Sequence, residues 1–69
     1  MNGYGLDFEV WFHYGKFDRD KLAVFVFRHH AEEYILSRGN FREFSIFDRR
    51  IQRELVLVND SEFDYRWET

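Results

Sequence analysis

Three histidines and several carboxylates are the side chains of this chain that could hold a metal ion. His29 and His30 are adjacent, and His13 comes earlier. The carboxylates considered with them are Glu32, Glu33 and Asp48. Adjacent residues point to opposite faces of a strand and lie roughly 100° apart around a helix, so His29 and His30 cannot easily share one zinc ion. The spacing favours solvated or helix-capping histidines, and we expect neither a metal nor another cofactor.

Covalent and acid–base catalysis have little support in the residue pattern. The chain has no cysteine, and Ser37 and Ser61 are expected on a helix and in a polar turn rather than in the sharp turn that exposes a catalytic serine. Gly3 and Gly5 lack the following helix and lysine of a phosphate-binding loop. Since 13 acidic residues in 69 will form chance pairs, adjacent carboxylates are a poor sign of acid–base partners. We therefore predict that the protein is not an enzyme.

Arginines cluster in the second half of the chain and alternate with phenylalanines. The arginines are Arg38, Arg42, Arg49, Arg50 and Arg53, and the phenylalanines are Phe41, Phe44 and Phe47. Aromatic side chains beside arginines on a sheet face stack bases in several readers of single-stranded nucleic acid. Acidic residues in the same half balance these charges, and the net charge of -3 argues against general phosphate binding. A nucleic-acid-binding accessory protein is therefore the alternative hypothesis rather than the leading one.

A set of apolar and aromatic residues is expected on the surface, where it would form a contact site for protein. The members on the side of the expected strands away from the core are Trp11, Phe47, Val56 and Val58. A second stripe near the C-terminus contains Phe63, Tyr65, Arg66 and Trp67. Tyrosine, tryptophan and arginine are enriched at interface hot spots. The alternative is that the C-terminal segment folds over its own sheet, and a homodimer through the same surfaces would combine both arrangements.

The leading hypothesis is a small protein-binding module that acts by occupying a surface of a larger protein, as an inhibitor would. The segment from Phe27 to Asp48, in which a strand leads into AEEYILSRG and returns through FREFSIFD, looks like a construction of many small bacterial and phage proteins. That resemblance covers a third of the chain and implies no activity. It agrees with an origin in a phage or mobile element.

The size and composition of the chain predict one domain, residues 1–69, with a core made mainly of aromatic side chains. A chain of 69 residues buries only about 60% of its unfolded surface. Because the chain has no cysteine to form a stabilising disulfide, its core must be densely packed. Aromatic residues, which make up 22% of the chain, must supply that packing. No apolar run approaches the roughly 18 residues of a spanning helix, and the N-terminus lacks the pattern of a signal peptide. We expect a cytoplasmic protein without a membrane partner.

One helix, in the stretch 29–40 that Gly39 and Asn40 end, organises the expected fold. Its apolar stripe is Ala31, Tyr34 and Ile35 with Arg38 beside it, and Gly39 is expected to end it in a left-handed conformation. Glu32 and Glu33 would then lie in the first turn and Arg38 in the last, each favoured by the helix dipole.

Alternating residues predict strands around this helix. In 6–14 the core side would carry Phe8, Val10, Phe12 and Tyr14. Residues 15–20 are expected to form a turn, in which the ring of Phe17 either folds back over the end of the core, the favoured alternative, or is exposed as a contact residue. Segment 21–28, KLAVFVFR, reads either as a strand or as the start of a longer helix, and its alternating valine and phenylalanine favour the strand.

A second hairpin is expected from 41–48 and 54–58. The favoured register places Asp48 opposite Arg53 as an ion pair, Ile46 opposite Leu55, and Phe44 opposite Leu57. The alternation of Phe63, Tyr65 and Trp67 with charged residues predicts a fifth strand or a docking arm. The expected fold is α+β, a curved, mainly antiparallel sheet of four or five strands in the order ββαββ with one helix on one face. Its expected core comprises Phe8, Val10, Phe12, Ala31, Ile35, Phe44, Ile46, Leu55 and Leu57.

Overall fold

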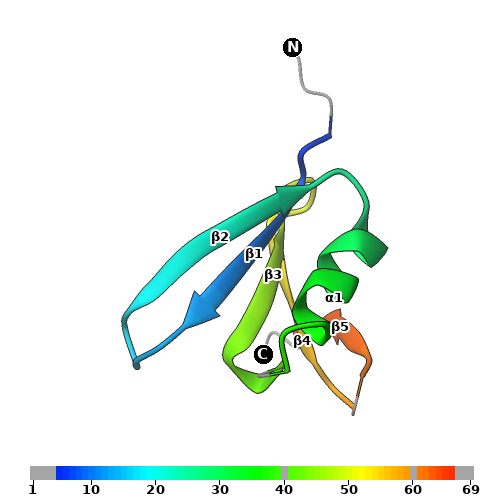
Figure 1. Ribbon diagram of the computed structural model, residues 1–69. Coiled ribbons are helices and arrows are strands. Elements are labelled where there is room, and N and C mark those ends of the chain that lie inside the picture. Colours follow the sequence, from blue (N-terminus) through cyan, green and yellow to red (C-terminus); the bar gives the residue numbers. More distant parts are fainter. Residues whose placement is uncertain (1–4, 40, 60, 67–69) are drawn as a thin grey trace.

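Five strands form one antiparallel sheet in the computed structural model, which describes residues 5–39, 41–59 and 61–66. The strands are β1 (Phe8–His13), β2 (Arg19–Phe25), β3 (Phe44–Asp48), β4 (Arg53–Leu57) and β5 (Phe63–Tyr65). Their order in the sheet is β2-β1-β3-β4-β5. The helix α1 (Arg28–Leu36) lies across one face of this sheet (Figure 1). The predicted α+β fold is confirmed.

The core lies between α1 and the face of the sheet that it covers. Ala31 and Ile35 are the buried residues of the helix. The buried hydrophobic side chains that meet them from the sheet are Phe8, Val10, Phe44, Ile46, Leu55 and Phe63. Phe12 and Leu57 pack at the edge of this cluster. The predicted core is therefore confirmed. It also contains Phe63, which was not among the predicted core residues.

Segment 21–28 is a strand up to Phe25, so the favoured alternative is confirmed. Phe27 has an extended backbone, with φ -112° and ψ 142°, and the helix begins at Arg28. The Arg28 side chain donates to Glu32 Oε2 at 2.6 Å and to the Phe63 carbonyl oxygen at 2.5 Å, which ties the start of the helix to β5. A β-bulge interrupts the pairing of β1 with β2. Val10 lies opposite Ala23 and Trp11 lies opposite Lys21, so the register skips Leu22.

The helix is shorter than predicted, and the expected charge placement is wrong. Because α1 runs from Arg28 to Leu36, no acidic residue lies in its first turn and no basic residue in its last. Arg38 lies beyond the last turn, where its backbone N–H donates to the Ile35 carbonyl oxygen at 2.9 Å. Gly39 has φ +97°, so the predicted left-handed glycine after the helix is confirmed.

The register of the second hairpin is confirmed at Ile46 with Leu55 and at Asp48 with Arg53, but the expected ion pair is wrong. Asp48 instead accepts hydrogen bonds from the Arg50 guanidinium at 2.9 and 3.0 Å, because Arg50 lies in the turn and reaches back. Arg53 donates to the Arg66 carbonyl oxygen at 2.9 Å. The expected strand 41–48 begins only at Phe44, since Phe41–Glu43 forms a 3₁₀ turn, η1.

Two aromatic residues near the β1–β2 turn, Tyr14 and Phe17, are more exposed than predicted. Tyr14 lies past the end of β1, and more than half of its side chain is exposed. Phe17 does not fold back over the core, since 89% of it is exposed. Figure 1 shows that this hairpin extends beyond the part of the sheet that α1 covers. The Tyr14 ring lies beside that of Phe12 at the edge of the core, 6.0 Å away between centroids, and its hydroxyl donates to Asp20 Oδ2 at 3.2 Å.

In the residues that the structure describes, the C-terminal segment forms the predicted fifth strand, which pairs along the edge of its own sheet rather than folding over a face of it. Strand β5 pairs antiparallel with β4, placing Phe63 opposite Leu57 and Tyr65 opposite Leu55. Phe63 is only 1% exposed. Trp67 lies outside the described residues. Among the helices in the described ranges, none has the length and apolar character needed to cross a membrane.

Candidate functional site

The face of the sheet opposite α1, here called the open face, is the candidate site. α1 is the only α-helix in the described ranges, and it packs on the other face. Since residues opposite each other in an antiparallel sheet share a face, the strand pairings assign the members of the open face. They are Glu9, Trp11, His13, Arg19, Lys21, Val24, Ser45, Phe47, Glu54, Val56 and Asp64.

Trp11 is held in place on the open face by charged neighbours. Its Nε1–H donates to Glu9 Oε1 at 3.0 Å. The Arg19 guanidinium lies over the indole ring, 4.6 Å from its centroid, in a cation–π contact. Glu9 Oε2 also lies 3.6 Å from Lys21 Nζ and 3.5 Å from Arg49 Nε. The carboxylate of Glu9 is buried beneath these groups, so the indole has a fixed orientation.

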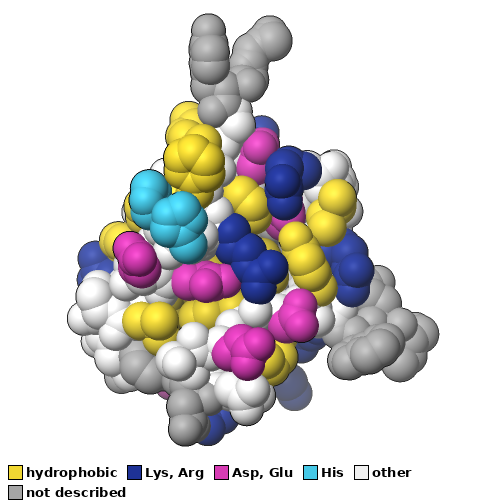
Figure 2. Space-filling view, turned by 90° about the vertical axis from the view of Figure 1, so that its right-hand side faces the viewer, with side chains coloured by type: hydrophobic (Ala, Val, Ile, Leu, Met, Phe, Trp, Pro, Cys, Tyr) yellow, Lys and Arg dark blue, Asp and Glu magenta, His cyan; other side chains and the backbone are white. Residues whose placement is uncertain are grey.

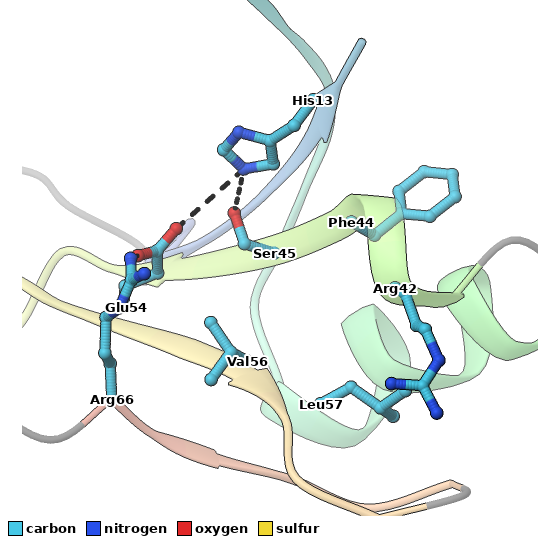
Figure 3. Close-up of a pocket in the computed structure, with 8 residues that line it drawn as sticks. All are labelled: His13, Arg42, Phe44, Ser45, Glu54, Val56, Leu57 and Arg66. Carbon is cyan, nitrogen blue, oxygen red and sulfur yellow. Dashed lines mark hydrogen bonds and ion pairs between the residues drawn. The ribbon is translucent and has the colours of Figure 1, made fainter. Parts of the chain in front are cut away.

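Four polar side chains form a second group at the end of the open face near the β1–β2 turn. His13 Nε2 and Ser45 Oγ share a hydrogen bond of 2.7 Å. The same His13 nitrogen lies 3.8 Å from Glu54 Oε2, and Arg66 Nη1 lies 2.7 Å from Glu54 Oε1. Figure 3 shows these side chains converging from β1, β3, β4 and the residue after β5.

The serine, histidine and glutamate of this group do not make a catalytic triad. In a triad the histidine faces the serine with one ring nitrogen and the carboxylate with the other. Here Ser45 and Glu54 both approach Nε2 of His13. Ser45 is also only 2% exposed, so it offers a substrate very little surface. The arrangement fixes side chains and offers no activated nucleophile.

Two neighbouring hollows open beside this polar group. The first has a volume of about 280 Å³ and is lined by His13, Arg42, Phe44, Ser45, Glu54, Val56, Leu57 and Arg66 (Figure 3). The second, of about 470 Å³, is lined by His13, Lys16, Phe17, Arg19, Glu54 and Arg66. Because His13, Glu54 and Arg66 line both, the two hollows form one depression, here called the hairpin-end hollow.

The predicted contact residues divide between the two sides of the sheet. Trp11, Phe47 and Val56 lie half-buried on the open face. Arg66 lies at its edge, where it lines the hairpin-end hollow. The prediction of Phe63 as a contact residue is wrong, because Phe63 belongs to the core and has almost no surface to offer a partner.

Tyr65 lies on the side of the sheet that faces α1. It is half-buried, and its hydroxyl donates to Asp48 Oδ2 at 2.8 Å. That contact fixes β5 to the end of β3.

Sequence reasoning favoured a folded-back ring for Phe17 over the exposed ring that the structure shows, and it missed the Ser45–His13 pair. The composition of the turn predicted a hairpin but not the direction of the Phe17 ring. Ser45 and His13 are 32 residues apart, and only the pairing of β1 with β3 brings them together.

The remaining histidines lie on the helix side of the molecule. The rings of His29 and His30 are 4.3 Å apart between centroids, and both contact the ring of Phe27. Figure 2 shows histidines gathered beside hydrophobic side chains on this side. Within 5–39, 41–59 and 61–66, no three or more His, Asp or Glu side chains are grouped so that they could hold a metal ion.

Comparison of the chain with protein-family models, curated proteins and solved structures finds no match. The class is therefore defined by the fold and the site alone. It is a small α+β domain whose sheet is covered by a helix on one face and carries an aromatic and charged surface on the other.

Proposed function

We propose that this protein is a non-enzymatic binding module that acts by occupying a surface of a larger protein. The observation that carries the proposal is Phe17, which is 89% exposed in the β1–β2 turn. Burial of a phenylalanine side chain against a partner is worth about 1.5–3 kcal/mol, and a few well-buried anchors supply most of the energy of an interface. The hairpin therefore offers a ready anchor beside the open face.

The open face supports the proposal with a surface of suitable composition. Protein interfaces combine an apolar centre rich in aromatic residues with a polar rim in which arginine is common. Trp11, Phe47 and Val56 supply the apolar part, while Arg19 and Arg66 supply charge at the hairpin end. Because Glu9 and the Arg19 guanidinium already fix the indole, little side-chain entropy would be lost on binding.

Nucleic acid is the less favoured partner for this face. Readers of single strands need free aromatic rings along a positively charged groove. The ring of Trp11 is already covered in part by Arg19. Asp64 is exposed on the same face and would repel a phosphate backbone, and the cationic side chains of Lys21, Arg49 and Arg66 already pair with Glu9 and Glu54.

The more specific predictions from the sequence concern inhibition, origin, location and dimerisation, and they are proposals too. Blocking a surface of its target would make the module an inhibitor. The phage or mobile-element origin and the cytoplasmic location stay predictions from the sequence. A homodimer through the open face is the competing arrangement, and sedimentation of the purified protein at several concentrations distinguishes it from a monomer.

The test compares two exposed phenylalanines in a pull-down from a native lysate of the source cells. Phe17→Ala should reduce recovery of the captured protein at least fivefold, as expected for loss of an anchor worth about 1 kcal/mol or more. Phe27→Ala is the matched control, because Phe27 is 56% exposed but lies at the start of α1. Equal recovery with both variants would refute the role of the open face.

A further inference from the structure

We infer that the hairpin-end hollow binds a carboxylate side chain from an acidic segment of the partner, an inference that rests on the proposed function. Four cationic side chains line the hollow, from separate parts of the fold. They are Lys16 in the β1–β2 turn, Arg19 in β2, Arg42 in η1 and Arg66 after β5. Among the described residues that line the hollow, Glu54 is the one carboxylate.

The positive charge of the hollow is not neutralised by its own walls. The Glu54 carboxylate is occupied by Arg66 at 2.7 Å, with His13 at 3.8 Å. In the part of the chain that the structure describes, no carboxylate lies within 4.0 Å of a side-chain nitrogen of Lys16, Arg19 or Arg42. The hollow is locally positive although the whole chain carries a net charge of -3, and its positive charge would attract an anion.

The shape and surroundings of the hollow favour a side-chain carboxylate. Arginine guanidinium groups hold carboxylates through paired charge-assisted hydrogen bonds. Figure 3 shows Arg42 and Arg66 on opposite sides of the first hollow, with Val56 between them. Phe17 lines the neighbouring hollow. An aspartate or glutamate in a partner segment would pair with Arg42 or Arg66. An apolar residue next to it would pack against Val56 or Phe17.

A nucleic acid fits this arrangement less well. Asp64 lies on β5 directly opposite Val56, so the positive charge does not continue along the face as a groove for a phosphate backbone would require. The hollow has cationic groups for one or two carboxylates rather than for a run of phosphates.

The first test is an NMR titration of the isotope-labelled protein with blocked hexapeptides. The probe alternates glutamate and valine, and the control alternates lysine and valine. We expect the glutamate peptide to shift the amide signals of His13, Ser45 and Glu54 in a saturable way, with no such shift from the lysine peptide. Equal shifts from both peptides, or none from either, would overturn the inference. Tighter binding of a ten-nucleotide oligothymidylate at the same amides would overturn it in favour of nucleic acid.

The second test uses matched charge reversals. Arg42→Glu should weaken binding of the glutamate peptide about three- to tenfold, because an attraction becomes a repulsion at the rim of the hollow. Arg38→Glu makes the same change at an exposed arginine that stacks on Tyr34 and does not line the hollow. Equal affinity of the two variants would contradict the inference.

Capture of the lysate partner separates the two proposals. If Phe17→Ala lowers capture and Arg42→Glu does not, the binding module stands and the acidic-segment inference falls. If Phe17→Ala has no effect on capture, the proposed function falls, whatever the peptide titration shows.

Discussion

At the scale of single residues, Asp48 is a carboxylate with no exposed surface at the end of β3. Two nitrogens of the Arg50 side chain, the Arg50 backbone N–H and the Tyr65 hydroxyl donate to it at 2.8–3.0 Å. The hydrogen bonds from Arg50 lower the pKa of Asp48, and they outweigh the opposing effect of burial. Burial and the neighbouring carboxylate raise the pKa of Tyr65, so its hydroxyl stays a donor.

The lowered pKa of Asp48 predicts a loss of stability in acid. The unfolded chain binds the proton more readily, so this contribution is present above the ordinary carboxylate pKa of about 4 and is lost as the pH falls through the folded-state pKa. Asp48→Asn should lower the free energy of unfolding by about 1–3 kcal/mol at pH 7 and by less at pH 3. Urea denaturation at both pH values measures this. Asp64→Asn, at an exposed position, is the control, and a penalty for Asp48→Asn that grows in acid would contradict the account.

Phe63 and Phe17 make a matched pair for the energy of burial. Phe63 is 1% exposed and Phe17 is 89% exposed. Phe63→Ala should cost about 3–5 kcal/mol, enough to unfold much of a domain this small. Phe17→Ala should leave the melting temperature nearly unchanged. A stable Phe63→Ala protein, measured by circular dichroism, would show that β5 does not close the core.

At the scale of elements, β5 makes the C-terminal segment part of the fold. Its pairing with β4 buries Phe63, and Arg28 at the start of α1 donates to the Phe63 carbonyl oxygen. Deleting residues 62–69 should therefore destabilise the monomer by several kcal/mol, since it removes strand pairing and core packing together. Denaturation and sedimentation measure the two quantities. Unchanged stability with a reduced sedimenting mass would instead indicate an arm exchanged between chains.

The sequence predicted most elements because hydrophobic periodicity reports directly on one-sided burial. Phe8 and Val10 on β1 and Ala31 and Ile35 on α1 are buried as that periodicity required. The rest depended on geometry that spacing does not contain. The register of Asp48 with Arg53 was correct, but Arg50, two residues after Asp48, pairs with it through both its backbone N–H and its guanidinium.

The alternation of Phe63 and Tyr65 predicted a strand with one covered face. It did not show which face of the sheet those residues would join. The pairing of Phe63 with Leu57 decides this, since it places the ring on the side that α1 covers. Two of the predicted contact residues, Phe63 and Tyr65, therefore lie on the covered face rather than on a surface open to a partner.

At the scale of the whole molecule, one helix cannot cover both faces of a five-stranded sheet. The covered face holds the core, and the open face keeps half-buried aromatic residues among charged ones. The β1–β2 hairpin reaches past the region under α1 and carries Phe17 with it (Figure 1). The exposed ring of Phe17, the open face and the hairpin-end hollow thus lie together. Phe27 and the two histidines that it contacts lie instead at the start of α1.

Photo-crosslinking at Phe17 tests the open face as the contact surface most directly. A photoreactive phenylalanine analogue replaces Phe17 in one protein and Phe27 in a second, and each is irradiated in the native lysate. The account predicts a covalent adduct with the captured protein from position 17 and little from position 27. An adduct from position 27 with none from position 17 would place the contact surface at the start of the helix and contradict the account.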